Sequence, residues 1–288
     1  MLDIQYILST FLLLFSGALV FWMAAGFTML EAGLVRSKNV TTQLTKNMGL
    51  FSLAAVFYYL IGYNVMYPLG TWMYDGVLSG IWGVAVLEAV GVTADGADDY
   101  GYAATGSDFF FQLMFCATTA SIVSGTIAER MKLWPFLIFT ILLTAFLYPI
   151  AASWQWGEGW LYAIGFSDFA GSTLVHSTGG AAALAGIILL GARNGRFDSA
   201  GNPKALKPFA ASSIPLVTIG VFILWLGWFG FNGGSQLALG TFDDAVAIST
   251  IFINTNLAAC GGVLAAATIT RLMYGKTDVI QMLNGAIG

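Results

Sequence analysis

The segment Asp168–Leu190 reads DFAGSTLVHSTGGAAALAGIILL and contains the only histidine of the 288-residue chain, His176. It has no lysine or arginine, and its one acidic residue, Asp168, lies eight residues before His176. Eight residues of an α-helix rise about 12 Å, so a spanning helix would place His176 near the middle of a bilayer and Asp168 near one face. An ionisable group at that depth is unfavourable and marks a candidate functional site.

The composition indicates that the rest of the chain also lies in a membrane. Charged residues make up 9% of the chain and hydrophobic residues 58%, whereas a soluble domain has about 25% charged residues. Seven apolar segments reach the length of about 20 residues that a spanning helix needs. They are residues 6–34, 44–67, 109–128, 133–153, 169–192, 209–231 and 244–270. An eighth is expected to begin near Asp278, and residues 68–107 are expected to form an extramembrane loop with a short surface helix in 76–92.

The distribution of basic residues predicts the orientation of these segments. We assign all eleven to the loops after the first, third, fifth and seventh segments: Arg36, Lys38, Lys46, Arg130, Lys132, Arg193, Arg196, Lys204, Lys207, Arg271 and Lys276. The positive-inside rule then predicts cytoplasmic basic loops and an external N-terminus. Asp168 and the WQWGEGW loop at 154–160 are consequently expected outside. The net charge of −4 gives no reason to expect a nucleic-acid partner.

Two polar residues of the fifth segment have competing interpretations. On an α-helix, Ser172 and Gly180 would share one face with His176, which allows a neighbouring helix or a narrow pore to approach. The alternative is a buried neutral imidazole bonded to another helix, and we favour the functional role for a lone intramembrane histidine. For Asp168 we favour a helix N-cap, and the alternative is a carboxylate that attracts cations at an external mouth.

The aromatic residues and cysteines are mostly expected to be structural. Trp154, Trp156 and Trp160 fit an interfacial belt, although one of them would hold a small cation if it faced a vestibule. The phenylalanines 109–111, 229 and 231 are explained by packing, whereas Ser235 in the FNGGS turn could face a vestibule. Cys116 and Cys260 both lie in apolar runs and are expected to be buried thiols. Since GxxxxGK, CxxC and HExxH are all absent from the sequence, we expect neither an enzyme nor a metal or cofactor site.

Four segments of the chain resemble the ammonium transporter family (Amt/Mep/Rh), and they lie nearer its bacterial Amt branch than its Rh branch. DFAGSTLVHSTGG at 168–180 is similar to the family signature. The other segments resemble the end of the family's first helix, its third helix and the end of its sixth. They are EAGLVRSKNV (31–40), FFFQLMFCATTASIVSGTIAER (109–130) and GWFGFNGGS (227–235). The four matches occur in the family's order and span most of the chain.

The resemblance implies roles for individual residues. Trp156, Ser235 and Phe111 match the external site that recruits ammonium, and Phe111 and Phe231 match two stacked rings that close the pore mouth. His176 matches the first of two pore histidines. Asp168 matches an aspartate that shapes the vestibule. The resemblance implies an all-α, polytopic membrane helix bundle with inverted repeats, which forms homotrimers with one pore in each subunit.

The family has eleven helices, so residues 1–288 are expected to form a single transmembrane domain that is truncated at its C-terminal side. Seven spans and the start of an eighth would be present, without the second histidine. The predicted function is ammonium transport across the plasma membrane, in which ammonium is deprotonated and ammonia passes a hydrophobic pore. The expected partners are ammonium or ammonia, with methylammonium as an analogue, the lipid bilayer and a cytoplasmic regulatory protein. The alternative is an ammonium sensor fused to a signalling module.

Overall fold

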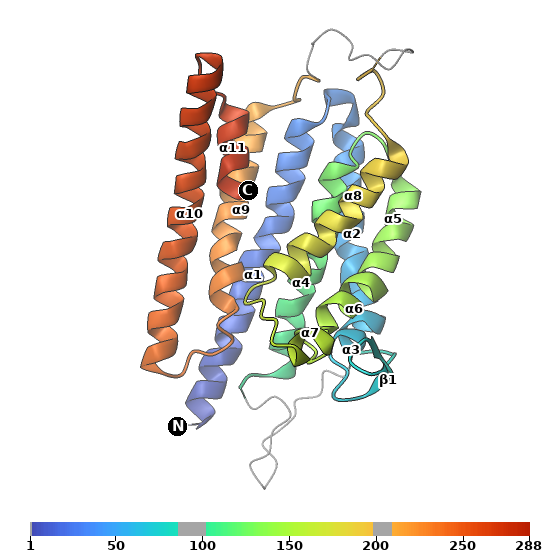
Figure 1. Cartoon of the computed structure of the whole chain (residues 1–288), viewed down its shortest axis with the longest axis vertical. Coiled ribbons are helices and arrows are strands. Elements are labelled where there is room, and N and C mark those ends of the chain that lie inside the picture. The colour runs from blue at the N-terminus through green and yellow to red at the C-terminus, as the bar shows by residue number, and fades with distance from the viewer. Residues whose placement is uncertain (1, 86–101, 198–208) are drawn as a thin grey trace. The chain divides into compact units, whose positions relative to one another are not determined.

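A computed structural model describes residues 2–85, 102–197 and 209–288, which are mostly helical (Figure 1). Seven helical segments are long and apolar enough to cross a membrane: Ile4–Leu34, Ser37–Met66, Thr105–Thr126, Leu133–Ser153, Ser172–Leu190, Ile214–Gly234 and Phe242–Tyr274. They correspond one to one with the seven predicted segments. The polytopic, all-helical membrane fold expected from the sequence is therefore confirmed.

The elements follow one another along the chain as labelled in Figure 1. The first half contains α1 (Leu2–Leu34), η1 (Ser37–Asn39), α2 (Val40–Phe57), η2 (Tyr58–Gly62), α3 (Tyr63–Met66), β1 (Trp72–Tyr74), β2 (Leu78–Ser79) and α4 (Thr105–Thr126). The second half contains α5 (Leu133–Leu142), η3 (Leu143–Leu147), α6 (Tyr148–Ser153), α7 (Trp160–Ala163), η4 (Ser172–Ser177), α8 (Thr178–Leu190), α9 (Ile214–Gly234), α10 (Phe242–Tyr274) and α11 (Val279–Ile287). The helix predicted to start near Asp278 is α11, whose first backbone N–H groups are capped by the Asp278 carboxylate.

Three of the spans contain a π-helical turn, namely η2, η3 and η4. Two of these turns pack against each other, since a Cβ atom added to Gly62 in η2 would lie 2.6 Å from the Thr144 carbonyl oxygen of η3. A π-turn inserts one extra residue into a helix and often occurs at a functional site. The third turn, η4, contains His176, so the wider turn falls in the segment that the sequence singles out.

The loop between the second and third spans contains a β-hairpin. Strands β1 and β2 pair in antiparallel fashion through a turn at Gly76, which has a φ of 60°. The short helix predicted in 76–92 is wrong over residues 76–85, where a strand and irregular backbone are found. Residues 86–101, which include the acidic stretch DGADDYG, lie outside the described residues.

Three basic residues assigned to loops, Lys38, Lys46 and Arg271, fall within the spans of the structure, and of these only Lys46 is buried. Lys46 belongs to α2 and is 1% exposed, so its assignment to a loop is wrong. Arg271 lies in the last turn of α10, where a cation interacts favourably with the C-terminal end of a helix. Lys204 and Lys207 are outside the described residues. The predicted orientation of the chain stays a prediction.

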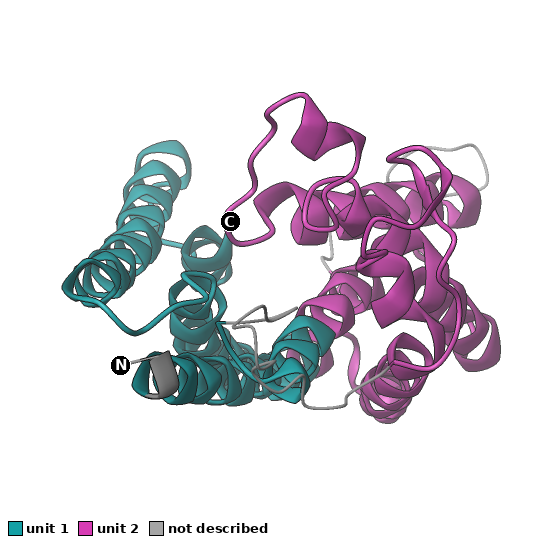
Figure 2. Ribbon diagram, turned by 90° about the horizontal axis from the view of Figure 1, so that it is seen from below, with its two compact units in different colours: residues 1–30, 87–114, 214–288 teal, residues 31–86, 115–213 magenta. Residues whose placement is uncertain are grey.

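The chain divides into two compact units, which Figure 2 shows in different colours. Unit 1 comprises residues 1–30, 87–114 and 214–288, and unit 2 comprises residues 31–86 and 115–213. In unit 1, glycines of α9 allow its backbone to approach α1. A Cβ atom at Gly220 would lie 2.5 Å from the Leu30 nitrogen, and one at Gly230 would lie 2.6 Å from the Ser16 carbonyl oxygen. Small residues at helix contacts are typical of membrane proteins.

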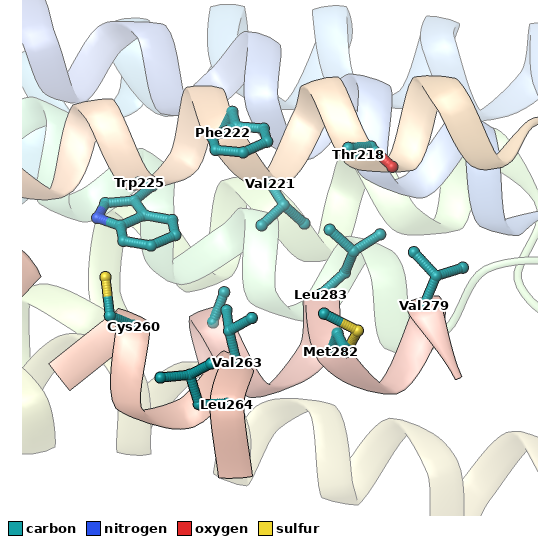
Figure 3. A pocket seen from close by; sticks show the side chains of 11 residues that line it. Thr218, Val221, Phe222, Trp225, Cys260, Val263, Leu264, Val279, Met282 and Leu283 are labelled. Carbon is teal, nitrogen blue, oxygen red and sulfur yellow. The ribbon is translucent and has the colours of Figure 1, made fainter. Parts of the chain in front are cut away.

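Helices α9, α10 and α11 of unit 1 line a partly open apolar cavity of about 480 Å³. Figure 3 shows the α9 side chains Trp225 and Val221 facing those of α10 and α11 across it. None of the predicted site residues lines this cavity. Cys260 does, and it is half-buried rather than buried as expected, whereas Cys116 is buried.

We predict that Gly262→Ala destabilises the contact between α10 and α11. A Cβ atom at Gly262 would overlap the Gly285 carbonyl oxygen, so the two helix backbones would have to separate. The expected loss is about 1–3 kcal/mol, measured as thermal unfolding of the purified protein in detergent. Gly261→Ala is the matched control, because nothing lies within 4 Å of its Cβ position. Equal behaviour of the two variants would rule out close packing at Gly262.

Candidate functional site

Asp168 fixes the backbone of the segment that contains His176. Its buried carboxylate accepts four backbone N–H groups: Gly171 and Ser172 at Oδ1 (2.8 and 3.0 Å), and Thr173 and Leu174 at Oδ2 (both 2.8 Å). These N–H groups begin η4 and have no earlier helical turn to bond to. The Asp168 side chain therefore caps this turn, as favoured from the sequence, although the N-cap residue itself is Gly171. The preceding turn is formed by Gly171, whose φ of 93° suits glycine.

His176 lies in the last turn of η4 and bonds back to Gly171. Its backbone N–H donates to the Gly171 carbonyl oxygen at 3.0 Å, and its ring Nδ1 lies 3.2 Å from the same oxygen. Because a carbonyl only accepts, this contact places a proton on Nδ1 and leaves Nε2 as the acceptor in the neutral ring. In an α-helix the His176 N–H would bond to the carbonyl four residues earlier, that of Ser172. In this π-turn it bonds instead to the carbonyl five residues earlier, that of Gly171.

Trp156 is tied to the same segment, and the two neighbouring tryptophans are not. The Trp156 indole Nε1 donates to the Asp168 carbonyl oxygen at 2.9 Å, and its ring meets Phe115 edge to face at 5.9 Å. Trp154 instead donates to the Val77 carbonyl oxygen at 3.0 Å and packs on Trp160 at 5.7 Å. Within unit 2, hydrogen bonds therefore join Trp156, Asp168 and the turn that holds His176.

The remaining predicted residues lie together in unit 1. Phe111 of α4 and Phe231 of α9 are each 1% exposed, and Ser235 is also buried. The Phe111 ring packs on Gly234, where an added Cβ would lie 2.7 Å from Cε2. The Ser235 hydroxyl donates to the Phe231 carbonyl oxygen at 2.8 Å. Phe111, Phe231 and Ser235 thus form one local group, and the residues around Asp168 form another.

Unit 2 contains a polar cluster inside its spans that was not predicted from the sequence. Glu31 of α1 is 4% exposed, and its Oε2 accepts hydrogen bonds from Gln43 Nε2 (2.5 Å), Asn47 Nδ2 (2.8 Å) and Ser124 Oγ (2.9 Å). These donors come from α2 and α4. One buried carboxylate therefore joins three helices.

Lys46 supplies the opposite charge of this cluster. Its ammonium group lies 3.2 Å from the Ser124 carbonyl oxygen, 3.5 Å from Gln43 Oε1 and 4.4 Å from the centre of the Phe136 ring. The Gln43 amide thus bridges the ammonium and the Glu31 carboxylate. The sequence did contain the signal, because Glu31 and Lys46 are charges of opposite sign inside predicted spans.

These helices and segments define a multi-pass membrane protein. A model of the ammonium transporter family matches residues 11–288, and the chain belongs to this family. It is 40% identical to ammonium transporter Amt2 of Archaeoglobus fulgidus over 95% of this chain and 56% of that protein. It is 38% identical to ammonium transporter 1 member 1 of Oryza sativa subsp. japonica over 90% of this chain and 53% of that protein. The chain therefore spans little more than half the length of these relatives.

Solved structures of the same family share the fold. A sensor Amt protein superimposes with a TM-score of 0.84 at 30% identity and covers 98% of this chain and 67% of its own. Mep2 of Saccharomyces cerevisiae superimposes with a TM-score of 0.83 at 27% identity and covers 99% of this chain and 60% of its own. Both likenesses extend across nearly the whole chain, so they include both units.

We predict that Glu31 and Lys46 are energetically coupled. Each single change, Glu31→Gln or Lys46→Met, leaves one buried charge uncompensated and should cost about 3–5 kcal/mol. The double variant removes both charges, so its loss should be smaller than the sum of the single losses. Unfolding in detergent measures all three, and Lys132→Met at an exposed position is the control for loss of a lysine. Simple addition of the single losses would show that the two groups do not interact.

Proposed function

We propose that this chain takes part in ammonium transport across a membrane. The observation that carries the proposal is the family match over residues 11–288. It is supported by relatives named as ammonium transporters that align with nearly all of this chain. The match is not confined to one motif, because it includes the four resembling segments and also Trp156, which lies outside them.

The proposed path begins at an external site formed by Trp156, Phe111 and Ser235, where an aromatic face and a hydroxyl hold ammonium. Phe111 and Phe231 gate the pore, and His176 lines it. A bare cation is strongly disfavoured in an apolar pore, whereas neutral ammonia needs only hydrogen-bond partners. Imidazole has an unperturbed pKa near 6.5 and is suited to proton handling. Ammonium therefore loses its proton on entry, and the ammonia and the proton pass separately.

Asp168 acts in this proposal as the residue that positions the others. The hydrogen bonds from four backbone N–H groups to its carboxylate, and the bond from Trp156 to its carbonyl, support this role. We further propose that the protein lies in the plasma membrane with its N-terminus outside. It forms homotrimers and binds a cytoplasmic regulatory protein.

Ammonium sensing is the second candidate function. It is favoured by the similarity to the sensor Amt protein, which covers 98% of this chain. The two functions differ in a measurable way, because a transporter shows net uptake of substrate. A sensor binds ammonium at the same residues with little or no net flux.

The proposal is tested by uptake of labelled methylammonium in cells that lack other ammonium transporters, with the longest natural protein that contains this chain. We expect His176→Ala to abolish or alter uptake while the protein still reaches the membrane and assembles. Ile188→Ala, on the exposed surface of the same span, is the control. Unchanged rate and selectivity in His176→Ala would instead favour a structural histidine. Binding of ammonium without uptake by the unmodified protein would favour the sensor.

A separate prediction concerns the external site. Trp156→Leu should weaken the apparent affinity for methylammonium by up to about 30-fold, because a cation–π contact contributes about 0.5–2 kcal/mol. Uptake should fall more at low substrate concentration than at saturation. Trp154→Leu is the matched control, since Trp154 is bonded to Val77 instead of Asp168. If both variants weaken affinity equally, Trp156 does not form the site.

A further inference from the structure

Four charged residues of unit 2 gather where α4 and α8 end. Three are arginines, Arg36, Arg130 and Arg193, and the fourth is Glu129. The Glu129 side chain is 0% exposed, whereas those of Arg36 and Arg193 are 28% and 26% exposed. Glu129 adopts a left-handed backbone conformation with a φ of 65°. The cluster thus contains three positive groups and one negative group.

Arg36 binds both carboxylate oxygens of Glu129. Its Nε lies 3.2 and 3.0 Å from the two carboxylate oxygens, its Nη2 lies 2.9 Å from Oε2, and its backbone N–H donates to Oε1 at 2.8 Å. Asn39 donates a further hydrogen bond to Oε1 at 2.7 Å. Burial acts to raise the pKa of Glu129, but these hydrogen bonds and the Arg36 charge outweigh it and lower the pKa below its ordinary value. Glu129 is therefore ionised, and both of its carboxylate oxygens are hydrogen-bonded to Arg36 or Asn39.

Arg130 and Arg193 have no comparable partner within the described ranges. Arg130 donates from Nη1 to the Gly191 carbonyl oxygen (3.0 Å) and from Nη2 to the Thr126 carbonyl oxygen (2.6 Å), and neither oxygen carries a formal charge. Its Nε is buried without an acceptor. Arg193 approaches Glu129 Oε2 at 3.9 Å, which is too long for a hydrogen bond. Burial and the neighbouring Arg193 charge lower the pKa of Arg130.

Arg130 and Arg193 thus repel each other and still have donors to offer. We propose that a phosphate group binds between Arg130 and Arg193. A tetrahedral oxyanion matches the planar fork of a guanidinium and accepts paired hydrogen bonds from it. It would add negative charge beside two arginines that Glu129, which is hydrogen-bonded to Arg36 and only 3.9 Å from Arg193, neutralises in part.

The position of the pair favours a phospholipid headgroup over free phosphate as the source. The apolar spans end at Thr126 and Leu190, four and three residues before Arg130 and Arg193. The pair consequently lies at the edge of the membrane-spanning segments, where basic pockets between helices bind anionic headgroups. The Arg130 and Arg193 pair also lies on the side that is predicted to be cytoplasmic from the distribution of basic residues.

The test uses the purified chain in detergent and measures both thermal unfolding and bound lipid by native mass spectrometry. Phosphatidylglycerol, diacylglycerol with the same acyl chains and inorganic phosphate are each added at constant ionic strength. A ligand that binds the folded state raises the unfolding temperature. Stabilisation by phosphatidylglycerol alone identifies the lipid as the source, and stabilisation by inorganic phosphate identifies the free ion. The proposal is overturned if diacylglycerol stabilises the protein as strongly as phosphatidylglycerol does. It is also overturned if none of the three compounds raises the unfolding temperature.

Arg193→Gln should weaken binding of the stabilising ligand about tenfold, because one charge-assisted hydrogen bond is lost. Arg193→Lys keeps the charge and should restore part of the affinity. Arg196→Gln is the matched control, since it removes the same charge from an exposed side chain three residues away. The proposal fails if Arg196→Gln weakens binding as much as Arg193→Gln, or if Arg193→Gln has no effect.

Discussion

The structure of unit 2 depends on the need to satisfy buried charge where little or no water is available. An unpaired buried carboxylate is so unfavourable that the surrounding chain must supply its partners. Glu31 takes donors from α2 and α4, Glu129 holds the turn between α1 and α2 to the end of α4, and Asp168 holds the start of η4. Each carboxylate fixes a junction that apolar packing alone would leave free to slide, because apolar surfaces have no direction.

These junctions also explain why particular positions of the spans are small. The second oxygen of Glu31 lies 3.0 Å from where a Cβ atom of Gly125 would be, so a larger residue on α4 would crowd the carboxylate. Gly179 at the start of α8 would place a Cβ 2.9 Å from the Thr119 carbonyl oxygen of the same α4. The glycines let helices approach closely enough for short polar side chains to reach across.

The sequence predicted those features that depend on long apolar runs and on local capping. The seven spans, the start of α11 at Asp278 and the cap formed by Asp168 all belong to this kind. The π-turn at His176 was not predictable, because apolar periodicity does not reveal one additional residue in a turn. Lys46 was wrongly assigned to a loop because a charged residue usually indicates a loop. Its compensating charge, Glu31, lies on another helix, so the pairing is not visible in the local sequence. The distinction between Trp156 and its neighbours came only from the family resemblance.

The hydrogen bonds around Asp168 link Trp156 to the turn that contains His176, so the positions of these residues depend on one another. Trp156 is bonded to the Asp168 carbonyl oxygen, the Asp168 carboxylate is bonded to the first N–H groups of η4, and His176 is bonded to Gly171 within that turn. A change at Trp156 therefore acts in two ways, through loss of its aromatic face and through displacement of the turn that holds His176. Under the proposed function, loss of the aromatic face would alter the affinity for a cation, whereas displacement of the imidazole would alter the rate at saturating substrate. The two effects separate in the concentration dependence of uptake, so the kinetics of Trp156 variants report whether the residue binds substrate or positions His176.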